Sequence, residues 1–388
     1  MAGLAVLGVC ALAIVFALIA QRQERQATAL AEQLGAEITR GRHTGALQSI
    51  QIGWTSGVQQ VSSTTGLKLA QLEGLMDPYV VALSFDGQSV DDEHLAEFTK
   101  LAELQALRLT GTNVTDRGLE SLVEMPRLRS LSLANTRASD SGVKWVGALA
   151  GLEDLNLSGI ELTDDGLAQL SLLDGLTSLN LTNTALSGSG LAHLARMRAL
   201  ERLSLYGTAI DDAGMSGLPQ FPDLQVLHLE GTDISDVGVQ YLQGLERLKF
   251  LGLSGTQVSG TGFQSLDRLR QMTRLVLTGS DFDDNGLAAL PTFPNLKRLD
   301  AADTRITDSG IKHLAALEKL EFLDLSGTAI SDAGLMWLGM LDNLKQVFLA
   351  ETNVTEFGLV AFASEYSEVD VSLRRPAKMA DENEWLGD

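Results

Sequence analysis

The sequence predicts an α/β solenoid in which one 24-residue unit, made of a short strand, a tight turn and a short helix, recurs along most of the chain. Three observations lead to this prediction. Strand-like cores recur at a fixed spacing from Leu107 to Val347, glycines fill one column of the same frame from Gly118 to Gly358, and eight aspartates share another. Because a unit of this size cannot bury its apolar face alone, neighbouring units must stack.

The strands are predicted from paired apolar residues such as Leu107 and Leu109, since alternate side chains of a strand point to the same face. The cores begin at Leu107, Leu131, Leu155, Leu179, Leu203, Leu227, Leu251, Leu275, Leu299, Leu323 and Val347. The same frame extends back to Leu83 and forward to Val371 without an insertion or deletion. Such regularity over thirteen frames cannot arise by chance.

Three polar or small columns accompany the strands. The aspartates, of which Asp116 is an example, stand just before each helix, where a carboxylate can accept hydrogen bonds from exposed helix amides. The glycines, such as Gly118, let the helix approach its neighbour closely. A threonine column that begins at Thr112 is expected to form a hydroxyl ladder that ties successive turns together, with Ile160 and Ser280 departing from it.

The consensus L-x-x-L-x-L-x-G-T-x-I-x-D-x-G-L-x-x-L-x-x-L resembles the leucine-rich repeat in its ribonuclease-inhibitor-like form. The resemblance covers residues 79–373, three quarters of the chain. It implies a leucine-rich repeat solenoid (horseshoe), with a parallel concave sheet and convex short helices. It also implies that a protein partner binds on the concave face. The whole chain is similar to bacterial N-terminally membrane-anchored leucine-rich repeat proteins.

The N-terminal segment Ala2–Ala20 contains nineteen residues without a charge. As a helix it would extend roughly 29 Å, close to the thickness of a bilayer core. This segment is therefore predicted to be a transmembrane anchor, with a cleaved signal peptide as the alternative. The protein would then be a single-pass membrane protein, and the side of the membrane on which the repeats lie stays open. The remaining boundaries place a polar spacer and cap at 21–78, the repeat array at 79–373 and a mobile tail at 374–388.

Composition excludes several function classes. Fifty Asp and Glu residues against 29 Lys and Arg residues give a net charge of −21, which argues against nucleic acid because phosphate binding requires a basic surface. The single cysteine excludes an internal disulfide framework and a cysteine-rich zinc site. The 45% hydrophobic content is that of a globular protein.

No catalytic constellation is recognisable, and we expect neither an enzyme nor a metal, a cofactor or a small-molecule substrate. His193 and His313 share a helix column but stand five units apart, which is roughly 24 Å at about 4.8 Å per stacked strand. Two alternatives stay open: an F-box-like substrate-recognition adaptor, and an enzyme with an unrecognised site.

The outward strand positions predict a partner-binding surface in the middle of the array. Its residues are Arg202, Tyr206, His228, Glu230, Phe250 and Arg274. A second cluster nearer the C-terminus contains Phe322, Asp324 and Phe348. Exposed aromatic residues beside arginines are typical of the residues that dominate protein interfaces. The sequence therefore predicts a membrane-tethered scaffold for protein–protein interaction through its concave face.

Overall fold

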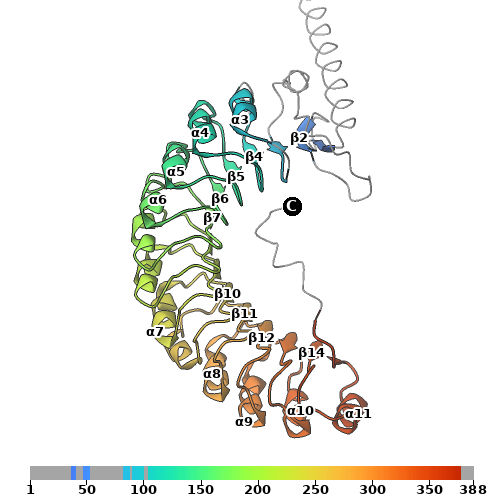
Figure 1. Cartoon of the computed structure of the whole chain (residues 1–388). Coiled ribbons are helices and arrows are strands. Elements are labelled where there is room, and N and C mark those ends of the chain that lie inside the picture. The colour runs from blue at the N-terminus through green and yellow to red at the C-terminus, as the bar shows by residue number, and fades with distance from the viewer. Residues whose placement is uncertain (1–35, 41–46, 53–81, 88–89, 100–103, 377–388) are drawn as a thin grey trace, which may run out of the picture. The chain divides into compact units, whose positions relative to one another are not determined.

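The computed structural model describes residues 36–40, 47–52, 82–87, 90–99 and 104–376 (Figure 1). The chain divides into two compact units, Met1–Asn156 and Leu157–Asp388, each of which is described by itself. Both are built from the predicted alternation of short strands and short helices.

Unit 1 begins with a hairpin and continues as a parallel sheet. Strand β1 (Ala36–Arg40) pairs antiparallel with β2 (Leu47–Ile52), and β2 pairs parallel with β3 (Ala82–Ser84). The parallel pairing then continues through β4 (Ala106–Arg108), β5 (Ser130–Ser132) and β6 (Asp154–Asn156). The helices between these strands are α3 (Asp92–Phe98), α4 (Asp116–Leu119), η2 (Glu120–Glu124) and α5 (Asp140–Val146), where η denotes a 3-10 helix.

Unit 2 repeats the same element order. Its strands are β7 (Ser178–Asn180), β8 (Arg202–Ser204), β9 (Val226–His228), β10 (Phe250–Gly252), β11 (Arg274–Val276), β12 (Arg298–Asp300), β13 (Phe322–Asp324), β14 (Gln346–Phe348) and β15 (Asp370–Ser372). Each pairs parallel with the next, and equivalent positions lie opposite each other, as Leu203 does with Leu227.

The helices of unit 2 are short and include both α and 3-10 forms. They are α6 (Asp164–Ala168), η3 (Gly190–Leu194), η4 (Gly214–Gln220), α7 (Asp236–Val239), η5 (Gln240–Gly244), η6 (Thr261–Ser265), α8 (Asp284–Ala289), η7 (Leu290–Thr292), α9 (Asp308–Ile311), η8 (Lys312–Ala316), α10 (Asp332–Leu338) and α11 (Glu356–Glu365). Within this unit the strands lie on the inner side of the curve and the helices on the outer side (Figure 1).

The core lies between the strands and the helices of each unit. The inward residues of a typical repeat, Leu227 and Leu229 from the strand side, Ile234 from the turn, and Val239 and Leu242 from the helices, are fully buried. The equivalent positions of the other central repeats are buried in the same way. The predicted fold class, a solenoid of stacked leucine-rich units, is confirmed.

The aspartate column has a different role from the one predicted. The helix cap in a typical repeat is the residue before the aspartate, because the Ser235 hydroxyl accepts a hydrogen bond from the Val237 amide at 3.2 Å. The aspartate of the previous repeat, Asp212, accepts from the Ser235 amide at 2.8 Å and from its hydroxyl at 2.6 Å. The carboxylate therefore fastens one repeat to the next. The same tie is made by Asp92, Asp116, Asp164, Asp236, Asp284, Asp308 and Asp332.

The expected threonine ladder between turns is wrong. The Thr112 hydroxyl donates to the Leu109 carbonyl at 2.7 Å, three residues earlier in the same repeat. Its equivalents make the same bond, and Ser280 retains it to the Leu277 carbonyl at 2.6 Å. These hydroxyls therefore close the turn within each repeat, while the aspartates make the contacts between repeats.

The predicted membrane localisation must be corrected. Among the residues that the structure describes, which begin at 36, no helix has the length and the apolar character needed to cross a bilayer. The segment Ala2–Ala20, on which the prediction of an anchor rested, lies outside the described residues. The segment 377–388 of the predicted tail also lies outside them.

Candidate partner-binding surface

The outward side chains of unit 2 stand on its strands in three columns. In each repeat one column precedes the first inward residue, one lies between the two inward residues and one follows the second. The parallel register places equivalent columns side by side, as with Phe250 and Arg274. Neighbouring parallel strands lie about 4.8 Å apart, so long side chains from adjacent repeats come into contact.

Four of the six predicted site residues contact one another. The His228 Nδ1 atom lies 3.0 Å from Glu230 Oε1, and the ring of His228 lies 4.5 Å from that of Phe250, centroid to centroid. The Arg274 guanidinium lies 5.3 Å from the centroid of the Phe250 ring. The Glu230 side chain fits over Gly252, where a β-carbon would collide with it. The group is thus a packed set of an acid, an imidazole, a phenyl ring and a guanidinium.

The other two predicted residues stand apart from this packed set. Arg202 is exposed on β8, and the Tyr206 side chain after that strand is 46% exposed. Within the described residues neither side chain makes a hydrogen bond, an ion pair or a ring contact with the other four. Both therefore offer free surface beside a preassembled group.

The structure joins the central cluster to the C-terminal one through two residues that sequence reasoning missed. Asp300 receives two hydrogen bonds from Arg298, at 2.9 and 3.0 Å, and lies 3.7 Å from Arg274 Nε. The Arg298 guanidinium lies 3.5 Å over the Phe322 ring, which lies 5.3 Å from the Phe348 ring. We call this continuous set the concave row: His228, Glu230, Phe250, Arg274, Arg298, Asp300, Phe322 and Phe348.

The signal for the two missed residues was present in the sequence. Arg298 occupies the same outward column as Phe250 and Arg274, and Asp300 the same column as His228. Only their ion pair, which depends on side-chain direction, could not be read from that spacing.

Burial affects the charges at the C-terminal end of the row. Asp324 is buried on β13, next to Asp300 in the register, and accepts a hydrogen bond from the Ser326 amide at 2.9 Å. Burial raises the pKa of Asp324, and the nearby Asp300 carboxylate raises it further. At the other end, the buried Oε2 atom of Glu230 has no hydrogen-bond partner among the described residues.

From residue 36 onwards, and outside the undescribed gaps, no group of three or more His, Cys, Asp or Glu side chains could hold a metal ion. The side chains of the concave row can recognise a partner by aromatic contact, hydrogen bonding and charge.

Comparisons with known proteins agree with the fold. Residues 103–123, 222–242 and 316–339 match the family described as Leucine Rich repeat. No curated protein matches the chain. Among solved structures, an internalin from Listeria monocytogenes superposes with a TM-score of 0.67 at 21% identity, covering 90% of this chain and 95% of its own. A leucine-rich repeat protein from Leptospira interrogans superposes with a TM-score of 0.51 at 17% identity, covering 80% of this chain and 94% of its own.

Identities this low establish a shared fold and nothing more specific. Neither the family match nor these two structures supports the alternatives of an F-box-like adaptor or of an enzyme.

Proposed function

Because the chain is a leucine-rich repeat protein, we propose that it is a recognition scaffold that binds a protein partner on the strand face of unit 2. Stacked repeats of this kind present an extended concave surface, which is the surface that such solenoids use for binding. The proposal places the contact on Arg202, Tyr206, His228, Glu230, Phe250 and Arg274. The proposed contact surface extends along the rest of the concave row.

The observation that carries the proposal is the continuity of the concave row. Side chains that already contact one another lose little conformational freedom when a partner binds, so less of the interaction energy is spent on ordering them. Arg274 and Arg298 both lie over phenyl rings and beside Asp300, which restrains their long side chains. Aromatic rings and arginines are also the residue types that dominate binding energy in protein interfaces.

Tyr206 and Glu230 indicate which chemistry the partner should offer. The exposed Tyr206 ring supplies apolar area with a hydroxyl at its edge, a combination enriched in interfaces. The unpaired Glu230 Oε2 atom would gain a hydrogen bond from a donor on the partner after a small rotation of the carboxylate. We therefore expect a protein surface with an apolar patch beside an amide, hydroxyl or ammonium donor.

The test is affinity purification with the full chain as bait, followed by measurement of the Kd of the captured protein. Tyr206→Ala should weaken binding by about 2 kcal/mol, or roughly thirtyfold in Kd, because it removes an exposed aromatic ring from the proposed contact surface. Its unfolding midpoint should match that of the wild type, since no described contact holds the ring.

The matched control is Tyr241→Ala, which removes a tyrosine that is 37% exposed on η5, the helix side of the same unit. This variant should bind like the wild type. If the two substitutions weaken capture equally, or if neither does, the partner does not bind on the strand face and the proposal fails.

A further inference from the structure

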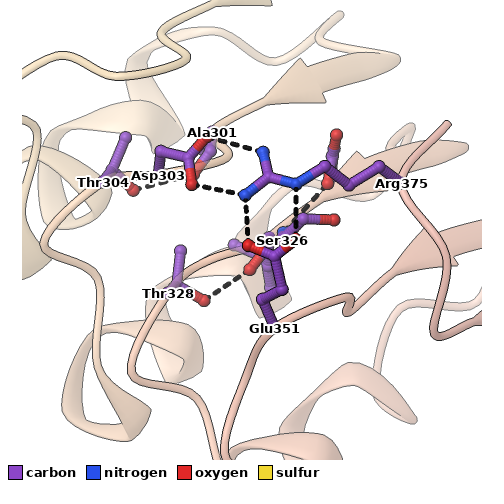
Figure 2. Close-up of polar contacts among 9 residues, drawn as sticks. Ala301, Asp303, Thr304, Ser326, Thr328, Glu351 and Arg375 are labelled. Carbon is purple, nitrogen blue, oxygen red and sulfur yellow. Dashed lines mark hydrogen bonds and ion pairs between the residues drawn. The ribbon is translucent and has the colours of Figure 1, made fainter.

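Two acidic residues of unit 2 hold the side chain of one arginine. The Arg375 guanidinium donates hydrogen bonds to Asp303 at 2.6 and 2.7 Å and to Glu351 at 2.8 and 3.2 Å (Figure 2). Gly327 occupies the equivalent position in the repeat between the two acids, and a β-carbon there would collide with the Asp303 carboxylate and lie 3.2 Å from Arg375 Nη2. The glycine therefore leaves room for the planar group. We call Asp303, Gly327 and Glu351 the arginine slot.

The backbone at the slot is unusual for acidic residues. Asp303 and Glu351 have positive φ angles of 54° and 57°, whereas the same column is elsewhere filled by glycines and by Asn135 and Asn183. This left-handed conformation is tolerated by asparagine and aspartate better than by glutamate. Local strain of this kind is characteristic of functional positions. A carboxylate retained at position 351, where glycine would be unstrained, therefore indicates a binding role.

The slot adjoins the C-terminal end of the concave row. Phe348 is the last residue of that row, and Glu351 follows it by three positions. Asp324 lies opposite Phe348 in the strand register. Burial raises the pKa of Asp324, and the positive charge of Arg375 partly offsets that rise, so the guanidinium acts on the strand face itself. A protein that lies along the concave row would therefore meet Arg375 at its end.

The segment that carries Arg375 is held mainly by this one side chain. In the interior repeats the pairing continues beyond the strands, as where the Gly327 amide donates to the Ala350 carbonyl at 2.7 Å. In the described part of the chain, the backbone of residues 374–376 makes no equivalent bond to another strand or turn. The side chains of Arg375, Asp303 and Glu351 are 39%, 43% and 68% exposed, and ion pairs so accessible to water are weak. A competing cation can therefore displace Arg375 at little cost.

We infer that the arginine slot recognises an exposed arginine of the protein partner, and that Arg375 occupies the slot until that arginine displaces it. This inference rests on the proposed function, because it assigns one more contact to the same partner. Two carboxylates require a cation between them. Three nitrogens of the Arg375 guanidinium make the four hydrogen bonds, a planar arrangement that the compact ammonium of a lysine cannot reproduce.

The experiment titrates N-acetyl-arginine amide into the isotope-labelled full chain and follows the backbone amide signals of Asp303, Gly327 and Glu351 by nuclear magnetic resonance. Arg375→Ala empties the slot and should bind this probe until it is saturated. The wild type should bind it about fivefold more weakly, because its own arginine occupies the slot for most of the time. N-acetyl-lysine amide at equal ionic strength should bind the variant several-fold more weakly than the arginine probe does.

The matched control adds Asp303→Asn to Arg375→Ala. Asparagine already has a positive φ angle at Asn135 and Asn183 of the same column, so the change removes a charge without straining the turn. Selective binding of the arginine probe should then be lost. Asp342→Asn, combined with Arg375→Ala, removes an exposed acid after α10 and changes the net charge equally. That variant should bind the probe as Arg375→Ala does.

Two results would overturn the inference. If Arg375→Ala does not distinguish the two probes, or keeps its preference after Asp303→Asn, the net charge of the protein attracts the probe and the slot does not. With the captured protein, Arg375→Ala should lower the Kd about fivefold, because nothing then competes for the slot. An unchanged Kd shows that the partner does not use it. If no protein is captured at all, the proposed function fails, whereas the probe titration still decides whether the slot accepts a guanidinium from outside the chain.

Discussion

At the scale of single residues, most glycines of the glycine column are explained by the aspartate that faces them from the previous repeat. A β-carbon on Gly310 would collide with the Asp284 carboxylate and come within 2.9 Å of Leu287 Cδ1. The Asp284 carboxylate holds the Thr307 amide at 2.8 Å and its hydroxyl at 2.6 Å. The glycine therefore preserves the tie between two repeats, in addition to letting their helices approach each other.

Gly310→Ala should lower the free energy of unfolding by about 1–3 kcal/mol, because the added methyl group must displace Asp284 or Leu287 from a packed site. Denaturant unfolding followed by circular dichroism measures this change. Gly244→Ala is the control, since a β-carbon there meets nothing within 4 Å. Equal stability of the two variants would show that the close approach does not constrain the residue type.

The leucine frame was sufficient to predict which residues are buried, because strand alternation fixes the face on which Leu227 and Leu229 lie. It was not sufficient to predict the bonds of the polar columns. Asp212 bonds Ser235, 23 residues ahead, and this proximity exists only after stacking. The same limit applies to the partner surface: the columns predicted His228 and Phe250, but not that Arg298 and Asp300 continue their row.

At the scale of elements, the last strand is fastened by a residue beyond it. Asp303, Gly327, Glu351 and Arg375 occupy one turn column at intervals of one repeat. Arg375 reaches Asp303 (Figure 2), and a β-carbon added to Gly327 would lie 3.2 Å from Arg375 Nη2. Asp303 and Glu351 have positive φ angles of 54° and 57°, a conformation that disfavours non-glycine residues. The Arg375 guanidinium lowers the pKa of both carboxyls and so favours their charged forms.

Arg375→Lys should loosen the last repeat although the positive charge remains, because an ammonium cannot form the two-pronged contact of a guanidinium. The expected loss is about 1 kcal/mol, since the group is partly exposed to water. Amide hydrogen exchange in β14 and β15 should then accelerate about fivefold, as that energy implies.

Arg374→Lys is the control for the contact of Arg375 with Asp303 and Glu351, because Arg374 is exposed and its side chain makes no described ion pair. If amide hydrogen exchange is unchanged in Arg375→Lys, or accelerates equally in both variants, the contact of Arg375 with Asp303 and Glu351 does not fasten the last repeat.

At the scale of the whole molecule, three of the aspartates that tie neighbouring repeats, Asp164, Asp236 and Asp332, have a lowered pKa and so make the stability depend on pH. Burial alone would raise the pKa of Asp236, but hydrogen bonds from the Ser259 hydroxyl and from the Gly262 and Gly260 amides outweigh it, and the pKa is lowered. Hydrogen bonds from Ser187 and Ser189 likewise outweigh burial at Asp164 and lower its pKa. A lowered pKa in the folded state stabilises the fold above the ordinary carboxyl pKa, and that contribution disappears as pH falls through the folded value.

The free energy of unfolding should therefore decrease as pH falls below about 4, the ordinary aspartate range. Urea unfolding at a series of pH values measures the slope, which should become shallower in Asp236→Asn. Asp324 acts in the opposite direction, because its raised pKa means that protonation relieves a buried charge. Asp324→Asn should therefore not flatten the acid slope. A slope identical in wild type and Asp236→Asn would show that the ties do not titrate.

The regular spacing of the aspartate ties has a consequence for how such a chain can change in length. Every tie joins two positions 23 residues apart, from Asp92 with Thr115 to Asp332 with Thr355. Removing or duplicating 24 consecutive residues between repeats that carry this pair recreates an equivalent aspartate–hydroxyl pair at the new junction. The column is interrupted at Gly188 and Gly260, where the residue 23 positions later is an aspartate, Asp211 or Asp283. A change by a length that is not a multiple of 24 residues leaves an aspartate facing the wrong residue. Genetic exchange between repeats of one gene can thus lengthen or shorten the recognition surface in whole steps, and a junction between repeats that carry the pair keeps its aspartate tie.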